Sequence, residues 1–65
     1  MGIWISVYFD NQEMDNVVAN NQQEADEIIK SIEMLGFANY NEDVKEDWLN
    51  MGFRNNPIVS AKISD

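Results

Sequence analysis

The chain has 65 residues, and its 12 acidic side chains outnumber its 4 basic ones, which gives a formal charge of −8. It contains no histidine and no cysteine, which excludes disulfides, zinc sites built on these residues, and nucleophilic catalysis by cysteine or through a histidine base. So acidic a surface repels nucleic acid and anionic membranes and attracts basic grooves of other proteins. We therefore expect a protein that is not an enzyme, holds no cofactor or metal, and binds neither nucleic acid nor membrane.

Apolar residues make up 45% of the chain, which is more than a disordered acidic tail carries. A domain of this size buries only about 60% of its unfolded surface, so its stability must come from apolar packing or from a partner chain. No apolar run approaches the roughly 20 residues of a membrane span, and no basic leader is visible. The sequence predicts one cytoplasmic domain over residues 1–65, in a bacterial host cell if the gene is phage-derived.

Residues 3–9 alternate with the period of two that is typical of a β-strand. One face of this strand would carry Ile3, Ile5, Val7 and Phe9, and the other Trp4, Ser6 and Tyr8. Residues 10–13 form a polar turn. Residues 15–19 are compatible both with a short second strand and with a loop.

A helix is predicted to begin after Asn21, whose side chain can cap it, with Glu24 placed to complete a capping box. Gly36 is expected to end this helix in a left-handed conformation. An apolar stripe at helical spacing supports the assignment. The stripe consists of Ala25, Ile28, Ile29, Ile32 and Leu35.

A second helix follows with similar end signals, because Asn41 is a good N-cap and Gly52 repeats the glycine ending. Its apolar stripe is Val44, Trp48 and Met51. After a break at residues 55–57, residues 58–63 alternate again and predict a terminal strand. The expected fold is α+β: a two- or three-stranded antiparallel sheet with two helices packed on one face, in the order β-(β)-α-α-β.

The second predicted helix carries four acids on the side away from its apolar stripe: Glu42, Asp43, Glu46 and Asp47. They form two like-charge pairs at i, i+4 spacing, and each such pair costs about 0.2–0.5 kcal/mol. A solvated face that keeps the protein soluble explains any single acid. A cationic partner would explain why the whole pattern is kept.

In size, charge and lack of catalytic residues, the chain resembles phage-encoded DNA mimics, such as anti-restriction proteins, uracil-DNA glycosylase inhibitors and some anti-CRISPR proteins. This likeness in kind rests on no shared motif. It implies a small acidic inhibitor, encoded by a phage or mobile element, that occupies the basic nucleic-acid-binding groove of a host defence nuclease or DNA enzyme. In such a protein the carboxylates stand in for phosphates and an aromatic residue anchors the contact. The candidate partner-binding residues are Glu24, Glu27, Glu33, Tyr40, Glu42, Asp43, Glu46 and Asp47.

The alternative is a non-enzymatic adaptor or antitoxin-like interaction module, in which the acids serve solubility and aromatic residues make the contact. If both helices cover one face of the sheet, Trp4 and Tyr8 lie on the opposite, open face. Exposed aromatic residues are common at interfaces. This alternative predicts a homodimer through the open face.

Overall fold

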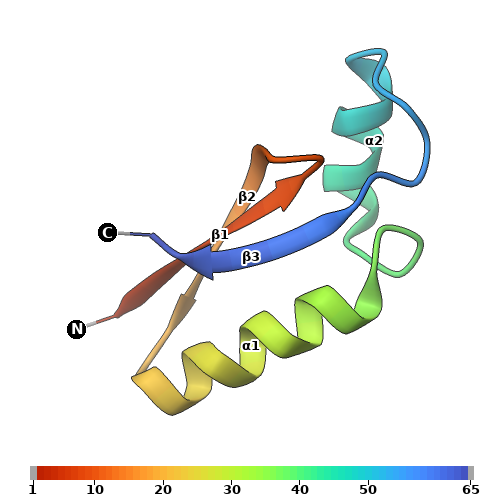
Figure 1. The fold of residues 1–65 in the computed structure, drawn as a ribbon. Helices are drawn as coiled ribbons and strands as arrows, with labels where there is room; N and C mark the ends of the chain where they lie inside the picture. Colours follow the sequence, from red (N-terminus) through yellow and green to blue (C-terminus); the bar gives the residue numbers. More distant parts are fainter. Residues whose placement is uncertain (1, 65) are drawn as a thin grey trace.

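Three antiparallel strands form one sheet in the order β2-β1-β3, with two helices between the second and third strands in the chain (Figure 1). The computed structural model describes residues 2–64. The elements are β1 (Ile3–Phe9), β2 (Gln12–Ala19), α1 (Gln22–Leu35), α2 (Glu42–Asn50) and β3 (Val59–Ile63). The predicted α+β class and element order are confirmed, and the second strand exists.

The β1–β2 hairpin turns at Asp10 and Asn11, whose φ angles are both positive, 48° and 68°. Two residues with positive φ match the twist of the flanking strands. The polar turn predicted over residues 10–13 is therefore shorter, and β2 is longer than the predicted residues 15–19. The first residues of β2 are mostly polar and do not show the alternation that predicts a strand. The extent of β2 depends instead on its pairing with β1.

A register shift in the hairpin sets which β2 side chains face the core. Val7 pairs with Asp15, whereas the next residue, Tyr8, pairs with Glu13. The extra residue, Met14, forms a β-bulge. Asp15 therefore lies on the core face with Val7, and Glu13 lies on the opposite face with Tyr8.

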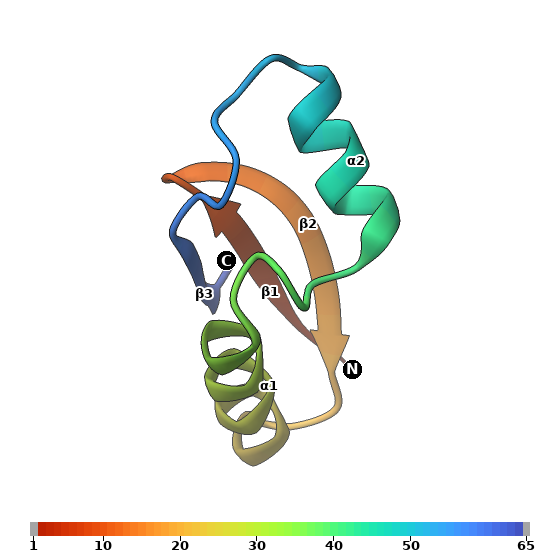
Figure 2. The same ribbon diagram turned by 90° about the vertical axis from the view of Figure 1, so that its right-hand side faces the viewer.

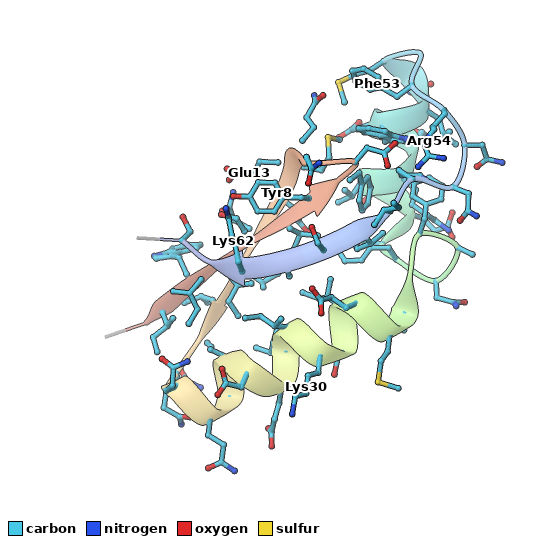
Figure 3. The ribbon with its side chains drawn as sticks, in the orientation of Figure 1. Tyr8, Glu13, Lys30, Phe53, Arg54 and Lys62 are labelled. Carbon is cyan, nitrogen blue, oxygen red and sulfur yellow. The ribbon has the colours of Figure 1, made fainter. Side chains whose placement is uncertain are left out.

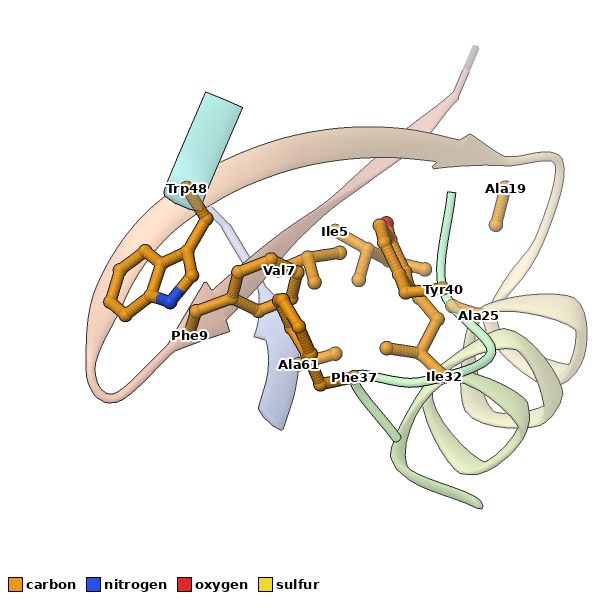
Figure 4. Packing of buried hydrophobic residues seen from close by; sticks show 10 residues of the cluster. All are labelled: Ile5, Val7, Phe9, Ala19, Ala25, Ile32, Phe37, Tyr40, Trp48 and Ala61. Carbon is orange, nitrogen blue, oxygen red and sulfur yellow. The ribbon is translucent and has the colours of Figure 1, made fainter. Parts of the chain in front are cut away.

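The core is built on one face of β1, where Ile5, Val7 and Phe9 are fully buried. The Phe9 ring is the centre of an aromatic cluster, with ring centroids 5.3 Å from Phe37 and 5.6 Å from both Tyr40 and Trp48 (Figure 4). All three contacts are edge-to-face, a favoured geometry for aromatic pairs. The remaining buried apolar residues are Ala19, Ala25, Ile32 and Ala61.

Helix α1 begins at the predicted cap and ends at the predicted glycine, but Gly36 has a ψ of −177°, which lies outside the left-handed helical region. The Asn21 side chain accepts a hydrogen bond from the Glu24 backbone N–H at 2.9 Å, and Gly36 has a φ of 69°. The Glu24 carboxylate accepts from the backbone N–H of Asn20, one residue earlier than a standard capping box. Leu35 is exposed, so the apolar stripe that packs on the sheet is narrower than predicted.

Helix α2 is also capped as predicted, since the Asn41 side chain accepts from the backbone N–H groups of Asp43 and Val44. Trp48 is buried, and its indole N–H donates to the Arg54 carbonyl at 2.7 Å. Met51 follows the last residue of the helix and is exposed rather than part of the core.

Both helices lie on the same side of the sheet, α1 near one end and α2 near the other (Figure 2). Helix α1 contacts all three strands and α2 contacts β2, but the two helices do not contact each other. The linker between them supplies Phe37 and Tyr40 to the core. The predicted packing of both helices on one face is therefore confirmed, and the opposite face of the sheet is uncovered.

Candidate functional site

A groove of about 750 Å³ runs along α2. We call it the α2 groove. Three exposed carboxylates line it beside apolar and amide side chains. Its lining residues are Phe37, Ala38, Glu42, Asp43, Lys45, Glu46, Leu49, Asn50, Asn55 and Asn56.

Local sequence rules place the acids of the α2 groove. Because Asn41 caps the helix, Glu42 and Asp43 fall in the first turn, where the helix dipole favours negative charge. Glu46 lies one turn after Glu42, on the same side of the helix. The groove therefore has a negatively charged rim set by a single short helix.

The far wall of the α2 groove comes from the loop that contains Asn55 and Asn56. Asn56 has a φ of 62°, a left-handed conformation that asparagine tolerates better than most residues. Asp10 holds the end of this loop, because its carboxylate accepts from the Ile58 backbone N–H at 2.9 Å. The hairpin turn thus helps to position the groove.

Lys45 is the one base in the lining, and the fold already engages it. Its Nζ donates to the Ala38 carbonyl at 2.7 Å and lies 3.0 Å from Glu42 Oε1. It also lies 5.9 Å from the centre of the Phe37 ring. Lys45 therefore offsets one charge of the rim, and Asp43 and Glu46 leave the groove with an excess of negative charge.

The structure brings together only part of the predicted site. Glu42, Asp43 and Glu46 share the α2 groove, whereas Asp47 lies outside its lining. The predicted α1 residues do not join them, because the two helices do not contact each other. Of these, Glu27 is exposed on α1.

Two of the predicted α1 acids hydrogen-bond to the protein's own backbone. Glu24 accepts from the Asn20 N–H at 2.9 Å, just beyond the end of β2. Glu33 Oε2 accepts from the Ala61 N–H of β3 at 3.4 Å. Ala61 pairs with Val7 in a position whose N–H points away from β1, so Glu33 covers part of a free sheet edge.

Tyr40 was the predicted aromatic anchor, but it is a core residue with 9% of its surface exposed. Its hydroxyl donates to Asp15 Oδ2 at 2.7 Å. Burial, followed by the hydrogen bond to Asp15 and its charge, raises the pKa of Tyr40 above its ordinary value. The ring packs against Phe9, so it cannot be offered to a partner without opening the core.

Sequence reasoning missed the apolar and amide residues of the α2 groove. Leu49 is 44% exposed and is the largest apolar side chain that the lining exposes. The only feature of the sequence that indicated a role for Leu49 outside the core was its position on the helix away from Trp48. The sequence at Asn55 and Asn56 predicted only a turn. Their position beside α2 could not be predicted, because it depends on the contacts that Asp10 makes with this loop.

Trp4 and Tyr8 lie on the uncovered face of the sheet, as their alternation with the core residues of β1 requires. Trp4 is 56% exposed and Tyr8 is half-buried. Lys62 extends over Tyr8, with its Nζ 5.2 Å from the ring centre. This face is separate from the α2 groove.

Among residues 2–64, no three acidic side chains converge in a way that could hold a metal ion. None of the helices in this range has the length and apolar character needed to cross a membrane. Comparisons with protein-family models, curated proteins and solved structures found no match to this chain. The geometry and charge of its own surfaces are therefore the basis for assigning a function.

Proposed function

We propose that this protein is a non-enzymatic inhibitor whose α2 groove binds a basic, nucleic-acid-binding surface of another protein. A host defence nuclease or other DNA enzyme is the expected class of target, with a phage or mobile element as the source of the gene. The observation that supports this proposal is the arrangement of Glu42, Asp43 and Glu46 around a concave surface that also exposes Leu49.

The chemistry of the groove suits arginine and lysine side chains. Carboxylates accept paired hydrogen bonds from the planar guanidinium group, which binds phosphate in the same manner. Acids one helical turn apart are separated by about 5.4 Å along the axis. DNA carries one charge per about 1.7 Å of axis, so the helix would imitate a sparse subset of phosphates.

The uncompensated charge on α2 also favours a cationic partner. Glu42 and Glu46 are a like-charge pair at i, i+4, which costs about 0.2–0.5 kcal/mol. Lys45 forms an ion pair with Glu42, whereas no basic side chain within residues 2–64 lies at ion-pair distance from Glu46. A bound basic side chain would supply the missing compensation, and Leu49 would add apolar contact at the centre of the interface.

The test is capture of partners from a bacterial lysate on the immobilised protein, with elution by increasing salt. We expect a DNA-binding enzyme to be retained at low salt and released at high salt, because the contact is between charges. Duplex DNA should displace it, and the free protein should inhibit its DNA binding in a gel-shift assay.

Two variants of α2 separate groove recognition from general attraction. Glu46→Lys and Asp47→Lys change the charge equally at adjacent positions, but only Glu46 lines the groove. We expect Glu46→Lys to abolish capture and Asp47→Lys to weaken it much less. Equal effects of the two variants, or capture that survives Glu46→Lys in a folded protein, would contradict the proposal.

The exposed Trp4 favours a second candidate function, an adaptor or antitoxin-like module that binds through the open sheet face. Its binding would be lost in Trp4→Ala and would resist high salt. Salt-sensitive capture that persists in Trp4→Ala therefore favours the inhibitor over the adaptor.

A further inference from the structure

The uncovered face of the sheet differs in charge from the rest of the molecule. We call it the open face, and it comprises Trp4, Tyr8, Glu13, Asn16, Val18, Ser60 and Lys62, together with Ser6, which is on the same side of β1 but is buried. Within residues 2–64, Glu13 is the one acid that strand alternation places there, and Lys62 balances it. In a chain of charge −8, the open face is thus electrically neutral.

Neutrality decides which partner this face suits. Two copies of so acidic a chain repel each other through most of their surfaces, but not through the open face. Trp4 and Val18 are opposite each other on β1 and β2, and they are 56% and 53% exposed. An apolar pair beside polar and charged side chains fits the apolar centre and polar rim of a protein interface.

We propose that the open face is a homodimer interface, in which the sheets of two copies pack face to face. The inference is independent of the α2 groove, because the open face lies on the other side of the sheet. Figure 3 shows Tyr8, Glu13 and Lys62 together on the side of the sheet away from α1. The occupant is a second copy of this chain, because the charges of the face complement themselves.

The sheet order sets the geometry of this complementarity. Glu13 is on β2 and Lys62 is on β3, on either side of the central strand β1. A two-fold axis along β1 places β2 of one copy over β3 of the other, as in aligned sheet packing. Glu13 pairs with Tyr8 in the sheet, and the Lys62 ammonium lies 5.2 Å from the centre of the Tyr8 ring. The charges of Glu13 and Lys62 are therefore at the same level along β1.

Each copy would therefore set its Glu13 opposite Lys62 of the other copy, so that two ion pairs form. The axis also brings the exposed Trp4 of one copy against Trp4 of the other, where the two rings can stack. Three strands at about 4.8 Å spacing and seven residues at about 3.4 Å rise define a face of only about 14 Å by 24 Å. Such a small interface makes a weak dimer rather than an obligate one.

Analytical ultracentrifugation of the full chain tests this at 0.1 M salt, over concentrations from about 10 µM to 1 mM, the range in which a small interface associates. We expect the average mass to rise from monomer towards dimer. Glu13→Lys and Lys62→Glu should each weaken self-association at least about tenfold, because each places like charges in both pairs. A mixture of the two variants should restore dimerisation, since every pair is then opposite in charge.

Matched variants on α1 control for net charge. Asp26→Lys and Lys30→Glu make the same charge changes at exposed positions away from the open face, and we expect the dimer to remain in both. Circular dichroism checks that all four variants are folded. A wild-type protein that stays monomeric to 1 mM, or a dimer that ignores the Glu13 and Lys62 reversals, would overturn the proposal. Failure of the mixture to recover dimerisation would overturn it as well.

Discussion

Asp10 and Arg54 form a two-pronged ion pair that joins the hairpin turn to the loop after α2. Arg54 Nε lies 2.6 Å from Asp10 Oδ2, and Nη2 lies 2.7 Å from Oδ1. The Arg54 hydrogen bonds, followed by the bond from the Ile58 N–H, lower the pKa of Asp10 to about 2, and Asp10 in turn raises the pKa of Arg54. Paired hydrogen bonds of this kind fix orientation as well as distance. The contact therefore helps to hold the loop that forms one wall of the α2 groove.

The first prediction concerns acid stability. The pKa of Asp10 falls from 3.8 to about 2 on folding, so the unfolded chain takes up this proton first as the pH drops. The stabilisation is thus complete above about pH 4 and is lost as the pH falls towards 2. We expect Asp10→Asn to lower stability at neutral pH and to flatten the loss of stability between pH 4 and 2.

Urea unfolding followed by tryptophan fluorescence, at several pH values, measures this effect. Arg54→Met serves as a second variant, because it removes the partner and leaves the Asp10 carboxyl in place. It should also flatten the acid dependence. Wild-type and Asp10→Asn curves that run parallel from pH 6 to pH 2 would show that the ion pair does not control acid stability.

The second prediction concerns the buried hydroxyl of Tyr40. Tyr40→Phe keeps the ring against Phe9 but removes the 2.7 Å hydrogen bond to Asp15. A hydrogen bond to a charged group contributes about 1.5–3 kcal/mol, and Asp15 remains partly solvated, so we expect a loss of about 1–2 kcal/mol in the free energy of unfolding. Tyr8→Phe makes the same chemical change on the open face and should cost less than about 0.5 kcal/mol. Equal losses in the two variants would contradict the assignment.

The third prediction concerns the end of α1. Gly36 has φ 69° and ψ −177°, a combination that is accessible almost only to glycine. A Cβ atom at this position would meet no atom of a more distant residue within 4 Å, so the local backbone conformation determines the cost of a side chain. We expect Gly36→Ala to destabilise the protein by about 1–3 kcal/mol. Chemical unfolding measures the change, with Lys30→Ala on the exposed face of α1 as a control, and a loss no larger than in the control would argue against strain at Gly36.

Part of the candidate site could be predicted from the sequence. Helical spacing alone places Glu42, Asp43 and Glu46 away from Trp48, and the structure finds these three around one groove. The α1 acids could not be assigned in this way, because helical spacing does not show what lies beside the helix. Glu33 lies against β3, and its carboxylate accepts a backbone N–H there.

The sequence by itself determined the features that depend on neighbours within one or two turns of chain. Asn21, Asn41 and Gly36 mark helix ends through local hydrogen bonds and backbone angles, and the alternation in β1 sets its core face. Only the tertiary structure decided the extent of β2 and the burial of Tyr40. These depend on contacts between distant segments, such as Asp15 with Tyr40, at a sequence separation of 25, or Asp10 with Arg54, at a separation of 44. Local sequence patterns do not indicate such pairings. The same polar residues are equally compatible with a loop until a neighbouring strand or ring contacts them in the folded protein.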